Sequence, residues 1–520
     1  MSDLWELPTS WCWTPIGDAT DVIGGGTPST TNPNNFEGSI PWITPADMSG
    51  YLGKTISGGA RFISEQGLAD SGARWLPQGA VLYSSRAPIG YVAVATRPVT
   101  TNQGFKSFVP GNGLNSDYLY YWLTSAKQHA EALASGTTFL ELSGAKAALI
   151  PLPLAPTAEQ TRIVKKLEEL LPDLDAGVAE LKAAQKKLGQ YRQSLLKAAV
   201  EGALTADWRA ARKVGAGETA PETGAQLLER ILADRRARWE AKQLAKFKEQ
   251  GKPAPRDWQK KYPEPVQPDT TDLPQLPEGW VWASGEQLCE FITKGTTPPK
   301  DLDVGGDKTI PFLRVTNLTN RGDLDLADKV FVSLETHQGF LSRSIVCPSD
   351  VLMNIVGPPL GQVAVVPPTY AAWNINQAIA IFRAVEGVLP WFVCRYLLSP
   401  AAQHWLKARS KTTAGQTNLT LEVCRSLPFP LPPQDEQQAL LNNLEMAMRA
   451  IADQGQAIDQ SRKQSTAQRQ NILRAAFSGQ LVPQDPNDEP ASVLLARIRA
   501  ERAKRETVKK PRGRKARETA

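Results

Sequence analysis

The segment Pro-Leu-Ala-Pro-Thr-Ala-Glu-Gln at residues 153–160 returns as Pro-Leu-Pro-Pro-Gln-Asp-Glu-Gln at residues 430–437. Each copy opens a long run that is poor in glycine. The first run closes with Leu-Leu-Lys-Ala-Ala-Val-Glu-Gly-Ala-Leu at 195–204, and the second closes with Ile-Leu-Arg-Ala-Ala-Phe-Ser-Gly-Gln-Leu at 472–481. Both ends match without an insertion, so the chain contains the same long segment twice.

Each long segment has the pattern of a helix. Carboxylates fall in the expected first turn, where they offset the helix dipole, and apolar residues recur at steps of three and four. At 1.5 Å per residue, a run of roughly 45 residues is about 65–70 Å long. This is too long for one ordinary helix inside a globular domain. The apolar positions are Ile163, Leu167, Leu170, Leu174, Val178, Leu181, Leu188 and Leu195 in the first copy and Leu440, Leu444, Ile451, Ile458 and Ile472 in the second.

Neither helix could bury its apolar stripe alone, so we expect the two to pack against each other with coiled-coil spacing. The second copy places Gly455 and Arg462 where the apolar seam should run. The alternative is that each segment is an isolated amphipathic helix on its own domain.

Composition is that of an ordinary globular protein with three or four domains, at 520 residues, 41% hydrophobic and 22% charged. The sequence has no apolar run of about 20 residues, as a membrane span needs, and its first residues lack the order of a signal peptide, so we expect a cytoplasmic protein. Five scattered cysteines without a C-x-x-C pair and three dispersed histidines predict no disulfide framework and no metal site.

The formal charge of +6 comes from the C-terminal tail. Residues 499–520 contain ten Lys or Arg against three Glu, so the rest of the chain is close to neutral. Binding to a phosphate backbone would therefore require the charges to be sorted onto one face.

The part of the chain that precedes each long segment is also repeated. Leu-Pro-Thr-Ser-Trp-Cys-Trp at 7–13 returns as Leu-Pro-Glu-Gly-Trp-Val-Trp at 276–282, and Gly-Gly-Thr-Pro at 25–28 returns as Gly-Thr-Thr-Pro at 295–298. Short strand-like runs, punctuated by Gly and Pro, precede one helix in each copy. The strands are expected at 80–84, 91–95, 105–109, 350–355, 362–366 and 378–382, and the helices at 116–134 and 389–408.

We therefore predict the α+β class, with two mixed α/β domains that are each followed by a long helix. The linker contains a helical segment at 224–250, and its sequence at 222–236 resembles 489–503. Such charged helices cover a surface or form a docking surface for a partner. The predicted parts are a first domain at 1–156, a first long helix at 157–204, a charged linker at 205–272, a second domain at 273–433, a second long helix at 434–481, and a C-terminal helix with a basic tail at 482–520 that is disordered at 509–517.

Catalytic motifs are not found. Gly-Lys-Thr at 53–55 lacks the earlier glycine of a phosphate-binding loop, and the glycines at 24–26 are not followed by a helix. The sequence at 32–36 only superficially matches the loop of amino-methyltransferases. A nuclease-like P-D…E-x-K pattern at 172–182 lies on the long helix, where its carboxylates could not converge on Mg²⁺. We expect no bond chemistry from this chain.

The two copies differ most in their polar loops. Residues 84–87 differ from residues 354–357, and the segment 135–138 differs from 411–418. Loops of Ser, Thr, Asn, Gln, Lys and Arg beside a β-rich scaffold suit contacts with base edges and phosphates. The alternative is that they are solvated loops.

The duplicated domain and helix closely resemble the DNA specificity subunit of type I restriction-modification systems. The resemblance depends on the helix-opening motifs at 151–164 and 430–437 together with the closing motifs at 195–202 and 472–479. It implies two target-recognition domains that each read half of a bipartite, asymmetric DNA site. The long helices would form an antiparallel coiled coil with a pseudo-twofold arrangement and set the length of the unread spacer, holding the domains more than one duplex turn, about 34–36 Å, apart.

The resemblance also implies partners. Two methyltransferase subunits and two translocase-nuclease subunits would bind this chain and carry S-adenosylmethionine, ATP and Mg²⁺, while the chain itself would bind no cofactor and no metal. Two alternatives are a fragment of a single-chain restriction enzyme and a scaffold for proteins rather than DNA. The candidate DNA-binding residues are Thr27, Arg86, Asn102, Gln103, Lys106, Thr137 and Thr138 in the first domain, and Lys294, Thr296, Arg314, Asn317, Asn354, Asn376, Gln377, Lys411, Thr412, Gln416 and Asn418 in the second.

Overall fold

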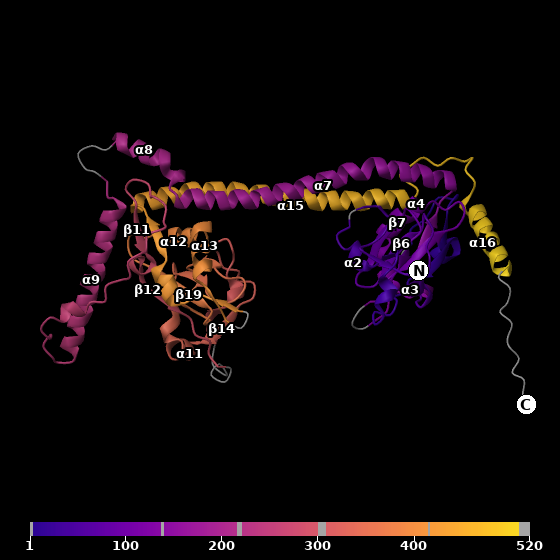
Figure 1. Ribbon diagram of the computed structural model, residues 1–520. Coiled ribbons are helices and arrows are strands. Elements are labelled where there is room, and N and C mark those ends of the chain that lie inside the picture. Colours follow the sequence, from indigo (N-terminus) through magenta and orange to yellow (C-terminus); the bar gives the residue numbers. More distant parts are fainter. Residues whose placement is uncertain are drawn as a thin grey trace, which may run out of the picture. The chain divides into compact units, whose positions relative to one another are not determined.

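The computed structural model describes residues 4–51, 53–136, 140–215, 221–299, 308–413 and 416–508 (Figure 1). The chain divides into two compact units, Met1–Lys182 with Asp459–Ala520, and Ala183–Ile458. The two boundaries between the units, at 182/183 and 458/459, lie inside the long helices α7 (Thr157–Val200) and α15 (Gln434–Phe477). Each of these helices has 44 residues. Each unit therefore contains one part of each long helix.

The first unit contains a five-stranded sheet, a three-stranded sheet and a two-stranded ribbon. The large sheet has the order β2 (Thr20–Gly24), β9 (Lys106–Pro110), β6 (Val81–Ser85), β7 (Ile89–Ala95) and β4 (Thr55–Ile56). The small sheet has the order β5 (Arg61–Ile63), β3 (Ile40–Ile43) and β8 (Thr100–Thr101), and the ribbon joins β1 (Cys12–Pro15) to β10 (Pro151–Leu154).

The second unit repeats this topology. Its sheets have the orders β12 (Cys289–Lys294), β19 (Ile379–Ala384), β16 (Val351–Asn354), β17 (Val363–Val365), and β14 (Val330–Ser333), β13 (Lys308–Leu313), β18 (Trp373–Ile375), β15 (Ile345–Val346). A ribbon joins β11 (Val281–Ser284) to β22 (Pro428–Leu431). The parallel pairing of β3 with β8 recurs between β13 and β18. The predicted α+β class and duplicated domain are confirmed.

The central strand of each large sheet is buried on both faces. In β6, Val81 and Tyr83 pack into the core beneath the helices, while Leu82 packs into the core toward the small sheet. Met353 and Leu352 divide in the same way in β16. Side chains alternate across a strand, so a continuous apolar run supplies both cores at once.

The helix predicted at 116–134 and the one predicted at 389–408 are each two helices, which is a correction. They are α4 (Ser116–Ser125) with α5 (Lys127–Leu133), and α12 (Pro390–Leu397) with α13 (Pro400–Arg409). In the second copy the break has a clear cause, because Pro400 lacks an amide hydrogen and suits the first turn of a new helix. The Ser399 hydroxyl caps that helix by accepting from the amide of Ala402, at 3.3 Å.

The glutamine near the start of each long helix is fully buried and fixes the helix to its domain. The Gln160 side chain accepts from the amide of Asn115 at 2.8 Å and donates to the carbonyl of Ala155 at 2.8 Å. Gln437 accepts from the amide of Leu389 at 2.9 Å and donates to the carbonyl of Gly387 at 3.1 Å. The same amide group thus joins the helix start to the loop before α4 or α12.

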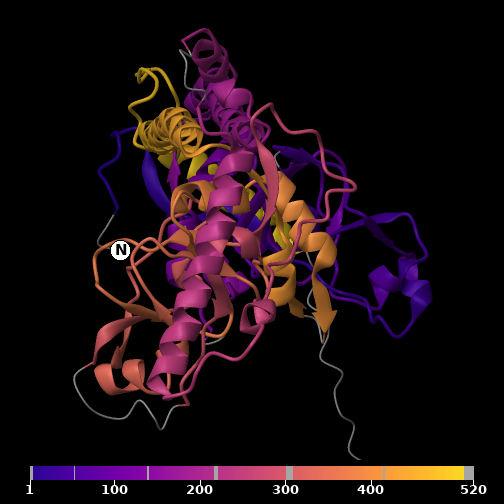
Figure 2. The same cartoon turned by 90° about the vertical axis from the view of Figure 1, so that its left-hand side faces the viewer.

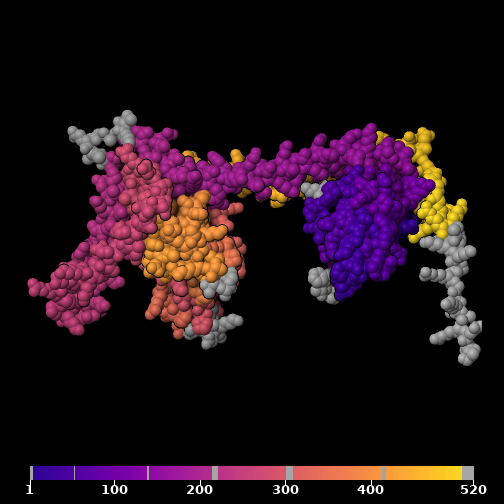
Figure 3. Space-filling model, in the orientation of Figure 1, coloured from indigo at the N-terminus to yellow at the C-terminus, as the bar shows by residue number. Residues whose placement is uncertain are grey.

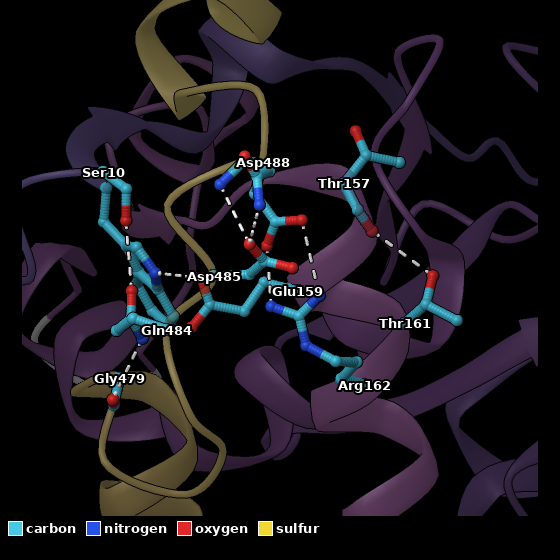
Figure 4. Close-up of polar contacts among 11 residues, drawn as sticks. Ser10, Thr157, Glu159, Thr161, Arg162, Gly479, Gln484, Asp485 and Asp488 are labelled. Atoms are coloured by element: carbon cyan, nitrogen blue, oxygen red, sulfur yellow. Dashed lines mark hydrogen bonds and ion pairs between the residues drawn. The ribbon is translucent and has the colours of Figure 1, made fainter.

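Glu159 joins the start of α7 to the segment after α15 (Figure 4). Its carboxylate accepts from the Trp11 indole at 2.9 Å and from the Gln484 amide. Beside it, Arg162 forms an ion pair with Asp488 at 2.6 Å. Burial raises the pKa of Glu159, although the hydrogen bonds from Trp11 and Gln484 favour its charged form.

The two long helices pack together and run antiparallel. In the first unit, Leu167 and Leu171 of α7 share a core with Leu473 of α15, and in the second unit Leu196 shares a core with Leu444. An ion pair between Arg469 and Asp175, at 2.5 Å, also joins the helices in the first unit.

Burial along the predicted apolar seam is concentrated at the ends of the helices, which corrects the uniform seam expected from sequence. Ile163, Leu167 and Leu195 are buried, together with Leu171 and Leu196, which were not predicted. The reason is geometric, since two helices alone cannot enclose a side chain, whereas the helix ends also pack on a globular domain. The predicted positions Leu170, Leu174, Val178, Leu181 and Leu188 are only half-buried.

The second repeat, between the linker and the C-terminal region, forms equivalent helices, α9 (Gly224–Glu249) and α16 (Ala491–Val508). Leu227 of α9 and Leu494 of α16 are fully buried against Gly387 and Gly113, whose φ angles are +90° and +94°. Both helices therefore cover the core of their own unit. Figure 2 shows α9 along the second unit, and Figure 3 shows α16, in yellow, on the first. The partner-docking alternative stays a prediction, and the predicted disordered tail lies outside the described residues.

We expect Gln437→Ala to lower the free energy of unfolding by about 2 kcal/mol, because it leaves the part-buried amide of Leu389 and the buried carbonyl of Gly387 without the Gln437 side chain as their partner. Urea unfolding of the purified chain measures this. The matched control is Gln438→Ala, at an exposed position on the same helix, which should change stability by no more than about 0.5 kcal/mol. Equal effects of the two substitutions would contradict the anchoring role.

Candidate nucleic-acid interface

One turn recurs in both domains with the same hydrogen bonds. The amide of Asn102 donates to Ile43 at 2.9 Å, and the amide of Asn376 donates to Leu313 at 3.0 Å. Each asparagine side chain then accepts from the amide two residues ahead, at 2.9 Å for Asn102 and 3.2 Å for Asn376. The side-chain oxygens of the asparagines therefore shape the turn, as Asx turns do.

The residue that follows each asparagine is exposed. Gln103 and Gln377 stand at equivalent tips, and each carries an amide that could bond adenine through two hydrogen bonds. The local geometry of both tips is fixed by backbone hydrogen bonds together with the bond that each asparagine side chain accepts. Both predicted glutamines are thus exposed at the tips of the turns.

A glycine loop lies against each turn. The amide of Gly25 donates to Phe105 at 3.2 Å, and that of Gly295 donates to Ile379 at 3.0 Å. A Cβ atom added to Gly25 or Gly295 would come within 2.0 or 2.2 Å of the carbonyl oxygen of the turn asparagine, so only glycine fits. This explains the repeated glycine of the Gly-x-Thr-Pro motif.

The glycine loop places Thr27, which is exposed, beside the first turn. In the second domain the matching residue is Thr297, not the predicted Thr296, which is half-buried. The Thr297 hydroxyl accepts from the amide of Gln377 at 3.5 Å. Strict alignment of the two Gly-x-Thr-Pro motifs would have selected Thr297.

The first domain gathers two cations near its turn. Lys106 donates to the carbonyl of Gln103 at 3.2 Å, and Arg86 lies 3.7 Å from Glu141. Ser135 and Glu141 are joined by a pair of backbone hydrogen bonds. Burial lowers the pKa of Lys106, with Glu141 acting against this shift and Arg86 adding to it. The structure thus brings Arg86, Gln103 and Lys106 together; Thr137 and Thr138 lie outside the described residues.

The second domain has a hairpin where a loop was expected, which is a correction. Strands β20 (Lys411–Thr413) and β21 (Gln416–Asn418) pair antiparallel. The amide of Gly357 donates to Thr417 at 2.8 Å, which joins the hairpin to the segment at 355–357, and Ile355 in turn donates to Ala378, next to Gln377. Lys411 and Thr412 are exposed on this hairpin, as is Lys294 at the end of β12.

The predicted residue Gln416 pairs through its backbone with Thr413. The Asn418 side-chain oxygen is buried and has no hydrogen-bond partner among the described residues. Unpaired buried acceptors are rare.

Three predicted residues have hydrogen-bond or ion-pair partners within the domain. The amide of Asn317 is buried and bonds the backbone of Asp325 at 2.9 Å and of Arg314 at 2.8 Å. Arg314 forms an ion pair with Asp328 at 2.5 Å. Asn354 is fully buried and bonds the carbonyl of Pro359 and the amide of Val356. These side chains hold loops in place.

Among the described residues, no group of three or more His, Cys, Asp or Glu side chains could hold a metal ion. Within the same ranges, no helix combines the length and the apolar character that crossing a bilayer requires.

The two domains, with one turn geometry and different flanking loops, define a protein with two related recognition modules. The family described as "Type I restriction modification DNA specificity domain" matches residues 8–182 and 277–454. The chain belongs to this family. It is a specificity subunit with two DNA target-recognition domains, and it is the non-catalytic component of its restriction-modification system.

The relatives span the whole chain or one domain. The EcoBI specificity subunit of Escherichia coli is 25% identical over 97% of this chain and 94% of its own length. The MjaIX specificity subunit of Methanocaldococcus jannaschii is 39% identical over 32% of this chain and 39% of its own length. A solved chain from work on assembly and conformational transition of the type I R-M system has a TM-score of 0.62 at 18% identity, covering 92% of this chain and 100% of that one. This last match supports the fold alone.

We expect Gln103→Ala to relax the bases read in one half-site, and Gln377→Ala to relax those read in the other, by about 10- to 100-fold, because each removes a possible bidentate amide contact. Methylome sequencing of cells that carry the variant system measures the change. Each variant is the control for the other, since the unaltered domain should keep its half-site. Unchanged recognition in both variants would remove the glutamines from the interface.

Proposed function

We propose that this chain reads a bipartite, asymmetric site on double-stranded DNA, one half through each α/β domain. The observation that carries this is the repeated turn, which presents an exposed glutamine from the same scaffold in both domains. What surrounds each turn differs. The first domain places Arg86 and Lys106 beside it, and the second places the hairpin at 411–418. Two domains that share one scaffold but carry different side chains and loops around the turn are suited to reading two half-sites of different sequence.

The long helices would set the number of unread base pairs between the half-sites. Both helices continue without interruption through the positions at which the chain divides into units. At 1.5 Å per residue a 44-residue helix is about 66 Å long. A continuous helix transmits any change in its length to both ends, whereas a flexible linker would absorb it.

Partner subunits would supply the chemistry. We assign adenine methylation to methyltransferase subunits and cleavage with translocation to restriction subunits, which would carry S-adenosylmethionine, ATP and Mg²⁺. The chain would position these subunits on DNA in the cytoplasm. The charged surfaces of α9 and α16 are candidate contact regions, because only one face of each is used against its own unit.

A protein scaffold that does not bind DNA is the second candidate. Salt dependence separates the two candidates. Contacts with phosphates weaken steeply as the salt concentration rises, because counterions released on binding then gain less entropy, whereas protein docking through apolar surfaces is not weakened in this way. Binding of the assembled complex to its site that is unchanged between 50 and 200 mM salt would favour the scaffold.

Exchange of residues 1–156 for the matching part of a related specificity subunit should change one half-site and leave the other intact. The physical reason is that each domain has its own cores and its own recognition turn. Methylome sequencing reads both halves in one experiment. Altered recognition in both halves would rule out independent reading.

Deletion of seven residues from the half-buried middle of each long helix should shorten the spacer and leave both half-sites unchanged. A deletion of seven keeps the faces of the helices in register, because two turns of helix contain about seven residues. The matched control deletes four residues from one helix only, which rotates its faces and should impair assembly. A spacer of unchanged length in the seven-residue variant would exclude the measuring role.

A further inference from the structure

An open pocket of about 790 Å³ lies in the second unit, where the end of α7 meets α13 and the segment before β11. Its wall is largely aromatic and apolar, and sites for organic groups commonly have volumes of about 300–1,000 Å³. The wall includes Val200, Pro274, Trp282, Tyr396, His404 and Trp405. We call it the aromatic socket.

The first unit contains the same socket, and hydrogen bonds establish which residues correspond. The Trp13 indole donates to the carbonyl of Trp5 at 3.0 Å, and the Trp282 indole donates to the carbonyl of Pro274 at 3.3 Å. The two donors occupy the same place in the strand ribbon, since Trp13 pairs with Pro153 and Trp282 with Pro430. Pro274 therefore stands where the first unit has Trp5.

The remaining walls correspond as well. Trp122 donates to the carbonyl of Pro151, and Tyr396 donates to that of Pro428, the equivalent position in the second ribbon. The helix-closing motifs align Phe477 of α15 with Val200 of α7. Three wall positions of the first socket, Trp13, Trp122 and Phe477, thus have counterparts in Trp282, Tyr396 and Val200 of the second.

In the first unit the socket is filled. The ring of Trp5 lies 5.2 Å from that of Trp13 and 6.2 Å from that of Trp122, both edge to face. The indole N–H of Trp5 donates to the carbonyl of Phe477 at 3.2 Å. A tryptophan is therefore the side chain that this set of walls accommodates, and Pro274 provides no such ring in the second unit.

We propose that the aromatic socket of the second unit is a docking site for a tryptophan side chain presented by a segment of a partner polypeptide. Burial of the indole would remove a large apolar surface from water, and edge-to-face contacts with Trp282 and Tyr396 would orient it. This inference is independent of DNA recognition.

Charge around the opening restricts the segment that carries the tryptophan. Three carboxylates, Glu201, Asp269 and Asp272, face two cations, Lys197 and Arg409. The excess of negative charge favours a neutral or basic segment over an acidic one.

The test uses the full chain and the probe acetyl-Leu-Trp-Lys-Leu-Pro-amide, which copies residues 4–8 with Lys in place of Glu6 and carries fluorine on its indole. Fluorine NMR observes the probe although the chain has 14 tryptophans. We expect saturable binding of one equivalent with a dissociation constant at or below about 1 mM. The same peptide with Ala in place of Trp should not bind.

Two variants block the socket in different ways. Pro274→Trp rebuilds the first unit's arrangement and should weaken probe binding at least tenfold while raising the melting temperature. Ala401→Trp adds a ring from an exposed position on the socket wall. It should therefore block binding of the probe without requiring the buried core of the domain to repack. Ala237→Trp, at an exposed position on α9 outside the socket, is the matched control and should bind the probe normally.

The reciprocal variant, Trp5→Ala, empties the first socket and should raise the stoichiometry from one to two. Failure of the wild-type chain to bind the probe, equal binding by wild type and Ala401→Trp, or no second site in Trp5→Ala would each overturn the proposal. Concentration-dependent self-association that disappears in Pro274→Trp would also overturn it, by assigning the socket to a second copy of the chain.

Discussion

The structure depends on a pair of buried glutamines, Gln160 and Gln437, at the starts of the two long helices. Each forms hydrogen bonds in both directions with backbone groups of its globular domain, so the helix cannot rotate without leaving buried polar groups unpaired. Glu159 and Glu436 add a second constraint, through Trp11 and Gln484 in one unit and Thr205 and Arg209 in the other. The recognition turn of each domain is thereby held in a fixed position relative to the start of that domain's long helix.

The domains keep one backbone and vary what it presents. Two cores on either side of a central strand and one asparagine turn recur in both domains, and the four strands that the large sheets share follow the same order. Because the strands and cores of the scaffold do not depend on the exposed side chains at the tips and flanking loops, those side chains can change at little cost in folding. The same logic applies to the aromatic sockets, in which one copy is filled from within by Trp5 and the other is left open.

Several candidate residues show why polar composition alone misleads. Asn102, Asn376, Asn317 and Asn354 have the chemistry to read a base, yet each uses its amide to hold a turn or a loop. An asparagine near a glycine serves a turn as readily as it serves a ligand. Gln103 and Gln377 each follow a turn asparagine by one residue. The hydrogen bonds that shape the turn leave these glutamine side chains exposed.

The sequence by itself determined the duplication, the two long helices, three strands of each large sheet and the family, because repeats and periodic apolar spacing are local properties of the chain. It did not determine which leucines are buried along the helices, as with Leu171 in place of Leu170, because this depends on what each helix face meets. It also gave no sign of the hairpin at 411–418 or of the open socket behind Pro274. Those features arise from contacts between residues far apart in the chain, and only the tertiary structure brings such residues together.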